Sequence, residues 1–272
     1  MVILMPRKLS GRAAPHSSAS QHIVDKIETV APLSRSEKTA ILALPVALKD
    51  FRRGVTVVRE GDHPTQSFAV LEGVTGMIKF TGAGDRHIVI FHFARDIPDL
   101  QSLHLDRLDV SIETITSCTL GFIPHAAIRE VCTDFPRIAA MLWRATLVDA
   151  AVLRECVLSI ARRPALMRVA HFLCEFVVRM KLAGRGDAAG CDLPLTQTEL
   201  ADGLGLSQVH VNRIVQSLRK RGLIALNRDQ FIVNDWNELK TVGDFDPGYL
   251  HLTPRQRNLL GDGAPLQYRP IS

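Results

Sequence analysis

Apolar and polar residues alternate in short runs from residue 51 to about residue 124. Gly, Asp and Pro separate the runs, for example at Gly73 and in the stretch 82–85. Alternation over four to eight residues is typical of half-buried strands, and turn residues between such runs favour antiparallel pairing. The pattern therefore predicts a small antiparallel barrel or roll. The expected strands include residues 55–58, 68–71, 77–80 and 87–93.

The period of the pattern changes after residue 135. Apolar residues then recur about every 3.5 positions through residue 160, the spacing of a long helix that pairs with a second helix. The repeat contains Ile138, Leu142, Ala145, Val152 and Cys156, with Asp149 as its one polar member. A helix that packs only on its own roll would use the same stripe, but a dimer seam is the favoured interpretation. Pro164 ends this helix, and a second helix is predicted for residues 165–180.

The segment from Gln197 to Gln216 has the spacing of a helix-turn-helix motif. Its first helix places three apolar residues on one face, and the smallest of them lets the second helix approach closely. These residues are Leu200, Ala201 and Leu204. Gly205 can adopt the positive φ that a tight reversal needs, and Ser207 is a good N-cap for the next helix.

The second helix of this motif is predicted to be strongly two-sided. Val211, Val215 and Leu218 face the core, while the opposite face carries Val209, Arg213, Gln216 and Lys220. Gly222 ends the helix. Residues 223–226 and 230–233 are strand-like around a turn at 227–229, which predicts a winged helix-turn-helix rather than an ordinary helical hairpin.

Length and charge agree with this interpretation. A chain of 272 residues is comfortable for two domains, and its formal net charge of +5 suits a polyanionic partner. Basic residues gather in and after the second helix, where DNA phosphates would lie. They are Arg213, Arg219, Lys220, Arg221 and Arg228.

Membrane, disulfide and enzyme classes are disfavoured. No apolar stretch reaches the roughly 20 residues of a membrane span. The five cysteines form no CxxC pair, which argues against a disulfide framework and a zinc ribbon and favours a reducing cytoplasm. The sequence holds no Gly-rich phosphate loop, GxSxG elbow or HExxH pair, so we expect no enzyme and no catalytic residues.

The run VTVVREGDHPTQSFAVLEGVTGMIKF resembles the β-roll of cyclic-nucleotide-binding-type sensor domains. Together with the winged helix, the chain resembles Crp/Fnr transcription regulators from about residue 23 to residue 252. The resemblance implies an α+β fold with an N-terminal antiparallel β-roll sensor domain, a long dimerisation helix and a C-terminal winged helix-turn-helix domain. The expected boundaries are a mobile tail at 1–22, the sensor at 23–135, the dimerisation helix at 136–163, the DNA-binding domain at 164–245 and an extension at 246–272, where regular structure should fade.

The resemblance also implies a function. We expect a cytoplasmic, sequence-specific transcription regulator that binds double-stranded DNA as a homodimer on a roughly palindromic operator, with RNA polymerase as a further partner. The alternative is a small-molecule or haem sensing module that acts mainly through a protein partner. Such a module would not need the outward arginine and the basic cluster.

We expect an effector other than cyclic AMP, which is the best-known effector of the family. Members that bind cyclic AMP use a Gly-Glu pair and, about ten residues later, an Arg followed by Ser or Thr. Here Pro98 and Asp99 occupy the first places, and Arg107 falls two residues early and precedes Leu108. Members with an iron–sulfur cluster carry cysteines near the N-terminus, whereas the first cysteine here is Cys118.

We therefore predict no cofactor, with haem or another small molecule left open as effector. The candidate haem ligands are His87, His92, His104 and His125. His87 and His92 face opposite sides of one strand, so a joint site is disfavoured. A redox-reactive thiol at Cys118 or Cys132, or no effector at all, are further alternatives.

The DNA-binding residues follow from the second helix. Arg213 matches the family's specificity arginine and can donate two hydrogen bonds to guanine. The family usually has glutamate where Val209 stands, and its oxygen-sensor branch has serine where Asn212 stands, so the operator should differ from the standard sites. Val209 could pack on a thymine methyl and Asn212 could pair with adenine. The full set of expected DNA contacts is Gln197, Thr198, Ser207, Gln208, Val209, His210, Asn212, Arg213, Gln216, Lys220 and Arg228.

Overall fold

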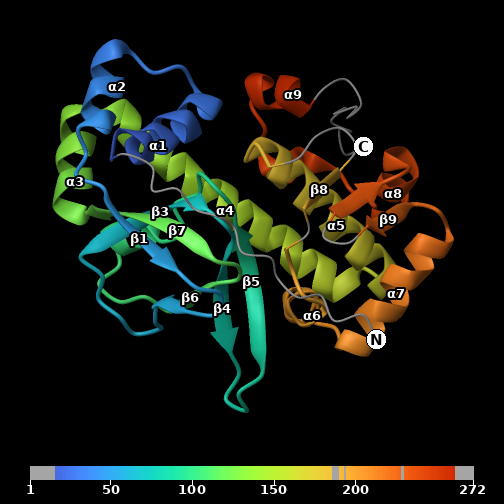
Figure 1. Ribbon diagram of the computed structural model, residues 1–272. Helices are drawn as coiled ribbons and strands as arrows, with labels where there is room; N and C mark the ends of the chain where they lie inside the picture. Colours follow the sequence, from blue (N-terminus) through green and yellow to red (C-terminus); the bar gives the residue numbers. More distant parts are fainter. Residues whose placement is uncertain (1–15, 186–189, 193, 228–229, 261–272) are drawn as a thin grey trace. The chain divides into compact units, whose positions relative to one another are not determined.

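The computed structural model describes residues 16–185, 190–192, 194–227 and 230–260 (Figure 1). Its contacts divide the chain into two compact units, and the boundary falls between Ala150 and Ala151, inside one long helix. The fold is α+β, with antiparallel strands concentrated in the first unit and helices in the second. The predicted fold class is confirmed. No described helix is long and apolar enough to cross a membrane.

Seven strands in two antiparallel sheets form the roll of the first unit. One sheet has the order β1-β7-β3 and the other β2-β6-β4-β5. The strands are β1 (Ala47–Phe51), β2 (Thr56–Val58), β3 (Gln66–Glu72), β4 (Thr75–Phe80), β5 (Arg86–His92), β6 (Ser111–Thr114) and β7 (Cys118–Pro124). The alternating pattern located β2, β3, β4 and β5, whereas β6 and β7 lie within the predicted strand region but were not among the expected strands. It missed β1, because this strand is largely exposed and does not alternate.

An apolar cluster from β3, β6 and β7 forms part of the core of the roll. Phe68, Val70, Ile112 and Leu120 are fully buried and pack in one cluster. The turn from β3 to β4 needs Gly73, whose φ is +89° and whose added Cβ would lie 2.4 Å from the Ser117 carbonyl oxygen. The turn is therefore closed to other residues.

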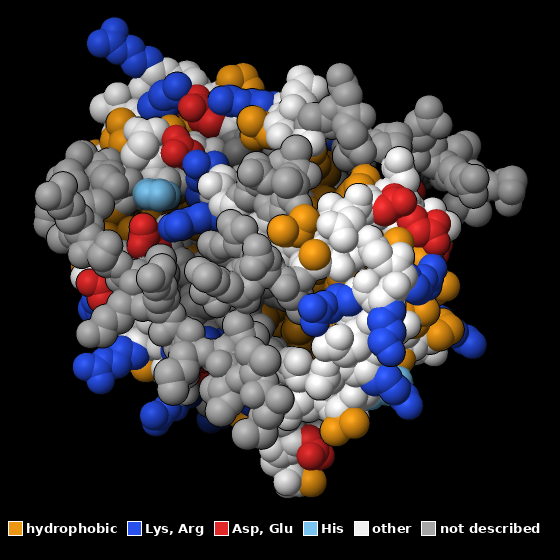
Figure 2. Space-filling view, turned by 45° about the vertical axis from the view of Figure 1, so that its right-hand side comes forward, with side chains coloured by type: hydrophobic (Ala, Val, Ile, Leu, Met, Phe, Trp, Pro, Cys, Tyr) orange, Lys and Arg blue, Asp and Glu red, His pale blue; other side chains and the backbone are white. Residues whose placement is uncertain are grey.

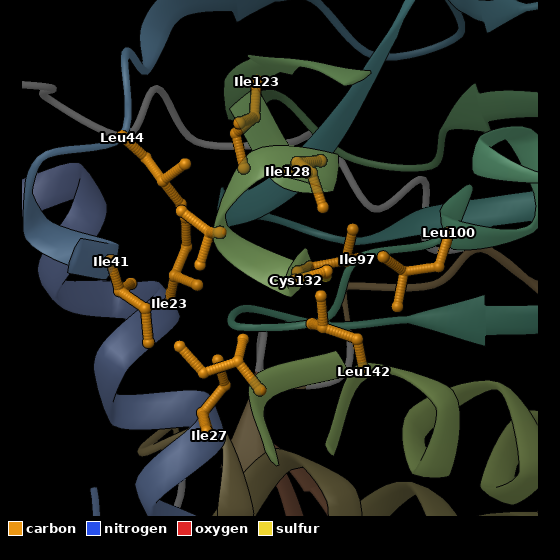
Figure 3. A pocket seen from close by; sticks show the side chains of 12 residues that line it. Ile23, Ile27, Ile41, Leu44, Ile97, Leu100, Ile123, Ile128, Cys132 and Leu142 are labelled. Atoms are coloured by element: carbon orange, nitrogen blue, oxygen red, sulfur yellow. The ribbon is translucent and has the colours of Figure 1, made fainter. Parts of the chain in front are cut away.

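Helices α1 (His16–Val30), α2 (Arg35–Leu42), α3 (His125–Asp134) and the start of α4 (Pro136–Arg162) enclose a second apolar core with the roll. Figure 3 shows Ile23 and Ile41 pointing toward Ile128 and Leu142 across a wholly apolar cavity of about 20 Å³. The space is too small for a nucleotide and offers it no polar partner. Helix α1 also corrects the expected tail at 1–22, because it begins at residue 16 and buries Ala19.

Helix α4 matches the predicted long helix, and the first part of its apolar stripe packs within the chain. Ile138 is only 2% exposed and packs in the core of the first unit, together with Leu142 and Ala145. The polar member of the stripe, Asp149, lies 3.4 Å from the Nε2 of buried His92 on β5. This part of the stripe therefore serves the protein's own roll, which is the less favoured of the two arrangements that its spacing allows.

A different face of α4 exposes large apolar side chains. Trp143 is 68% exposed, Leu147 52% and Val157 67%. Trp143, Ala150 and Val157 stand seven residues apart, so they share one face of the helix at the heptad spacing.

The second unit runs from the C-terminal part of α4 into α5 (Ala165–Leu182) and contains the predicted helix-turn-helix and wing. Its other elements are β8 (Gly190–Asp192), α6 (Gln197–Leu204), α7 (Gln208–Lys220), β9 (Ile224–Asn227), β10 (Gln230–Val233), α8 (Trp236–Gly243), a 3-10 turn η2 (Pro247–Leu250) and α9 (Pro254–Leu260). The wing sheet has the order β8-β10-β9. Strand β8 has three residues, too few to show a periodic pattern, so only its pairing with β10 defines it.

The segment after residue 246 is more regular than expected. Pro247 and Leu250 of η2 are buried, and the hydroxyl of Tyr249 donates a hydrogen bond of 2.7 Å to Glu175 on α5. Tyr249 also stacks on His171 of α5 at 5.8 Å between ring centroids. These contacts, 74 to 78 residues apart in sequence, hold η2 against α5, and α9 follows up to residue 260. Residues 261–272 lie outside the described part.

Candidate nucleic-acid interface

Helix α6 is fixed at both ends. Thr196 is its N-cap, and a capping box joins Thr196 to Glu199: the Glu199 N–H donates to the Thr196 hydroxyl, and the Thr196 N–H donates to the Glu199 carboxylate. The helix ends at Gly205, whose φ of +60° is the predicted left-handed turn. The capping box itself was not predicted, although its T-x-x-E signal is present in the sequence.

A residue from another helix also holds α6. The Arg168 guanidinium on α5 donates a hydrogen bond of 2.8 Å to the carbonyl of Leu204, one of the last of α6. Helix ends leave such carbonyls without partners, so this contact stabilises the turn. No local pattern could have predicted it, because the two residues are 36 positions apart.

The inward face of the motif is as predicted. Leu200, Ala201 and Leu204 of α6 are buried. Val211, Val215 and Leu218 of α7 are buried too, and Ile214 extends the same face beyond the predicted residues. Ser207 caps α7 by accepting a hydrogen bond of 3.3 Å from the His210 N–H.

The outward face of α7 is open to solvent. The exposed members of the predicted contact set are Thr198, Ser207, Gln208, Val209, Asn212, Arg213, Gln216 and Lys220, while Gln197 and His210 are half-buried. Several Lys and Arg side chains lie close together at the lower right of Figure 2, and others are spread over the rest of that face. Among the described residues Arg213 has no ion-pair partner, so its guanidinium is available to a ligand.

The other basic residues of the predicted cluster differ in whether they have a partner within the chain. Arg221 pairs with Glu238 of α8 at 3.1 Å, and Arg219 donates weakly to Gln216 at 3.4 Å. Lys220 is exposed at the end of α7. Arg228 lies outside the described residues.

Two family models match this architecture. A cyclic nucleotide-binding domain matches residues 48–135, and a Crp-like helix-turn-helix domain matches residues 167–242. The nitrogen fixation regulation protein FixK of Bradyrhizobium diazoefficiens is 30% identical over 178 residues, which cover 65% of this chain and 73% of that protein. The chain belongs to the Crp/Fnr family of transcription regulators.

Other members of the Crp/Fnr family agree. The transcriptional activator protein FnrL of Cereibacter sphaeroides is 28% identical over 221 residues, covering 79% of this chain and 88% of FnrL. The structure of FixK2 from Bradyrhizobium japonicum superposes with a TM-score of 0.66 at 20% identity, covering 73% of this chain and 98% of FixK2. The family regulates transcription and binds DNA, and it is not a family of enzymes, so these predictions are confirmed.

Asp99 and Arg107 occupy the region where Crp/Fnr members that bind cyclic AMP are expected to hold the cyclic phosphate, and their surroundings do not suit that role. Asp99 is fully buried; its Oδ1 accepts a hydrogen bond of 3.0 Å from the Phe68 N–H, and its Oδ2 has no partner in the described part of the chain. Arg107 is exposed and donates to the Gly61 carbonyl at 3.1 Å. Neither residue forms the charged cradle that a cyclic nucleotide needs.

Burial dominates the electrostatics of Asp99. Removal from water raises the pKa of this carboxyl to about 7, even though the hydrogen bond from Phe68 opposes the shift. The protonated acid is therefore a substantial form near neutral pH.

The candidate thiols and histidines of the roll are mostly buried. Burial raises the pKa of the Cys118 thiol and also that of Cys132, which argues against a reactive thiolate at either position. His125 is buried, and its Nε2 lies 3.1 Å from the Ser67 hydroxyl and 3.0 Å from that of Ser102. His92 is buried, His87 is half-buried and His104 is exposed. The described residues contain no cluster of three or more His, Cys, Asp or Glu arranged to hold a metal.

Proposed function

We propose that this Crp/Fnr regulator is a homodimer that recognises a roughly palindromic DNA operator with α7. The observation that carries the proposal is the division of α7 into a buried apolar face and an exposed face bearing Asn212, Arg213, Gln216 and Lys220. The two copies of α7 would enter successive major grooves about 34 Å apart.

The remaining contacts would come from around α7. Gln197, Thr198, Ser207, Gln208 and His210 lie near the starts of α6 and α7, where helix N-termini favour phosphate oxygens. Lys220 and Arg228 would add phosphate contacts. With DNA as its ligand and RNA polymerase as its second partner, the protein acts in the cytoplasm.

The test of this function is selection from random duplexes. We expect the protein to enrich one palindrome whose half-site centres lie about 10 base pairs apart. Binding to that palindrome should weaken as salt rises while remaining preferred over random DNA. If selection enriches nothing, the protein does not read sequence, and the second candidate, a sensing module for a protein partner, takes its place.

The effector of this regulator is proposed to be a ligand other than cyclic AMP. Buried Asp99 and outward-facing Arg107 support this, since neither offers a charge to a cyclic phosphate. Titration with cyclic AMP should leave operator affinity unchanged, and a saturable increase in affinity would contradict the proposal.

The dimer is proposed to form through the exposed face of α4. Changing both Trp143 and Leu147 to Glu should weaken dimerisation by roughly a hundredfold or more, because two large apolar side chains would no longer be buried. Sedimentation velocity over a range of concentrations measures this. The matched control is Leu42→Glu on α2, which alters an apolar side chain of similar exposure, 42%, away from α4. Dimers of unchanged strength in the double variant would refute this interface.

A further inference from the structure

The side chain of Val209 is unusually exposed for a hydrophobic residue. It is 80% exposed, more than any other large hydrophobic side chain in the part of the chain that the structure describes. Its neighbours on the outward face, Asn212 and Arg213, are polar or charged. Scattered exposed valines are common, but this one lies on the face that the proposed function assigns to DNA.

The place of Val209 on α7 sets what it can reach. It lies in the first turn of the helix, where the N-terminal residues of a recognition helix contact base edges. Arg213 follows four residues later on the same face. Four residues rise about 6 Å along a helix, so the two side chains would reach bases within about two steps of each other.

The chemistry of the side chain selects one group in the groove. An isopropyl group has no hydrogen-bond donor or acceptor, whereas the edges of guanine, adenine and cytosine present such groups to the major groove. Thymine alone adds a methyl group there. A glutamate in this place, as the family resemblance implies, would instead accept a hydrogen bond from cytosine.

We infer that Val209 is a specificity-determining residue that contacts the C5-methyl group of a thymine, within about two base steps of the guanine read by Arg213. The inference rests on the proposed DNA-reading function, and it specifies one base of the operator. It assigns a thymine to a position where a glutamate-bearing relative would favour cytosine.

The test removes only the methyl group from the DNA. In the selected palindrome, each thymine of one half-site is replaced in turn by deoxyuridine, and equilibrium affinity is measured for the wild type and for Val209→Ala. At one position near the guanine the wild type should lose about fourfold in affinity, the effect of one buried methyl group. Val209→Ala should bind thymine and uracil at that position equally well.

A second variant reverses the chemistry. Val209→Glu should shift the preferred base at the same position toward cytosine in a new selection. Both substitutions change an exposed side chain, so folding should be unaffected, and circular dichroism checks this. The inference is overturned if the wild type is indifferent to every methyl group, or if Val209→Ala keeps the same sensitivity. If the wild type shows no sequence preference at all, the proposed function is overturned as well. The selection from random duplexes reveals that outcome before the methyl test begins.

Discussion

Replacing Arg213 by alanine is expected to lower affinity for the selected operator by about 1 to 3 kcal/mol for each half-site, with little change in binding to random DNA. The reason is the geometry of the guanidinium, which can donate two hydrogen bonds to O6 and N7 of one guanine. Arg213 is exposed on α7 opposite the buried stripe, so its removal should not disturb the fold. Gel shifts with the operator and with a duplex of random sequence measure the two affinities.

Lys220→Ala is the matched control for Arg213→Ala. Lys220 lies at the C-terminal end of α7, where a cation is suited to phosphate rather than to base edges. Its loss should weaken binding to all sequences alike and reduce the slope of log affinity against log salt by about 0.9 for each phosphate contact removed. If Arg213→Ala gave the same uniform loss, Arg213 would be a phosphate contact and not a base reader.

The Asp99→Asn variant is expected to be more stable than the wild type at pH 8, by up to about 4 kcal/mol. The pKa of Asp99 is raised from an ordinary value near 4 to about 7 by burial. The folded chain therefore holds a proton that the unfolded chain releases. The wild type loses stability as pH rises from about 4 through 7, and a neutral asparagine does not take part in that loss.

Urea unfolding of both proteins at a series of pH values and one protein concentration tests this expectation. The free energy of unfolding of Asp99→Asn minus that of the wild type should rise from pH 4 to pH 7 and then level off. An amide group at the position of Oδ2 adds a cost that does not depend on pH, so it does not change this trend. Asp106→Asn, which changes an exposed carboxyl near Asp99 in sequence, is the control variant. A difference independent of pH would show that Asp99 ionises normally in the folded protein.

The part of the fold that sequence predicted well is the part that local periodicity determines. The apolar residues of α7 recur three and four positions apart and so define its two faces. The sequence alone therefore places Val211, Val215 and Leu218 inward and Arg213 outward. The positive φ at Gly205 is predictable for a similar reason, because only a glycine makes that reversal without strain.

The errors arise where a contact joins distant residues. A stripe of period 3.5 shows that Ile138 and Leu142 share a covered face, but it cannot show whether the covering surface belongs to the same chain or to a partner. Asp149 looked like an interruption because its contact, His92, lies 57 residues away. The order of the segment around Tyr249 depends in the same way on Glu175 and His171 of α5.

The exposed face of α7 was predictable from the sequence, but the operator that this face would read was not. Exposure and chemistry assign Arg213 and Val209 to a reading face, whereas the operator also depends on the angle at which α7 enters the groove. The same holds for the sensor, where Asp99 proved to be a buried acid and not a ligand for an anion.

The ratio of specific to non-specific affinity decides whether α7 reads base sequence. It is measured by competition between the selected palindrome and random duplex of equal length, at several salt concentrations. For a regulator that reads bases with α7, we predict a ratio of about a thousandfold or more at physiological salt. A ratio near one at every salt concentration would contradict the claim, since only the charge of the protein would then hold it on DNA.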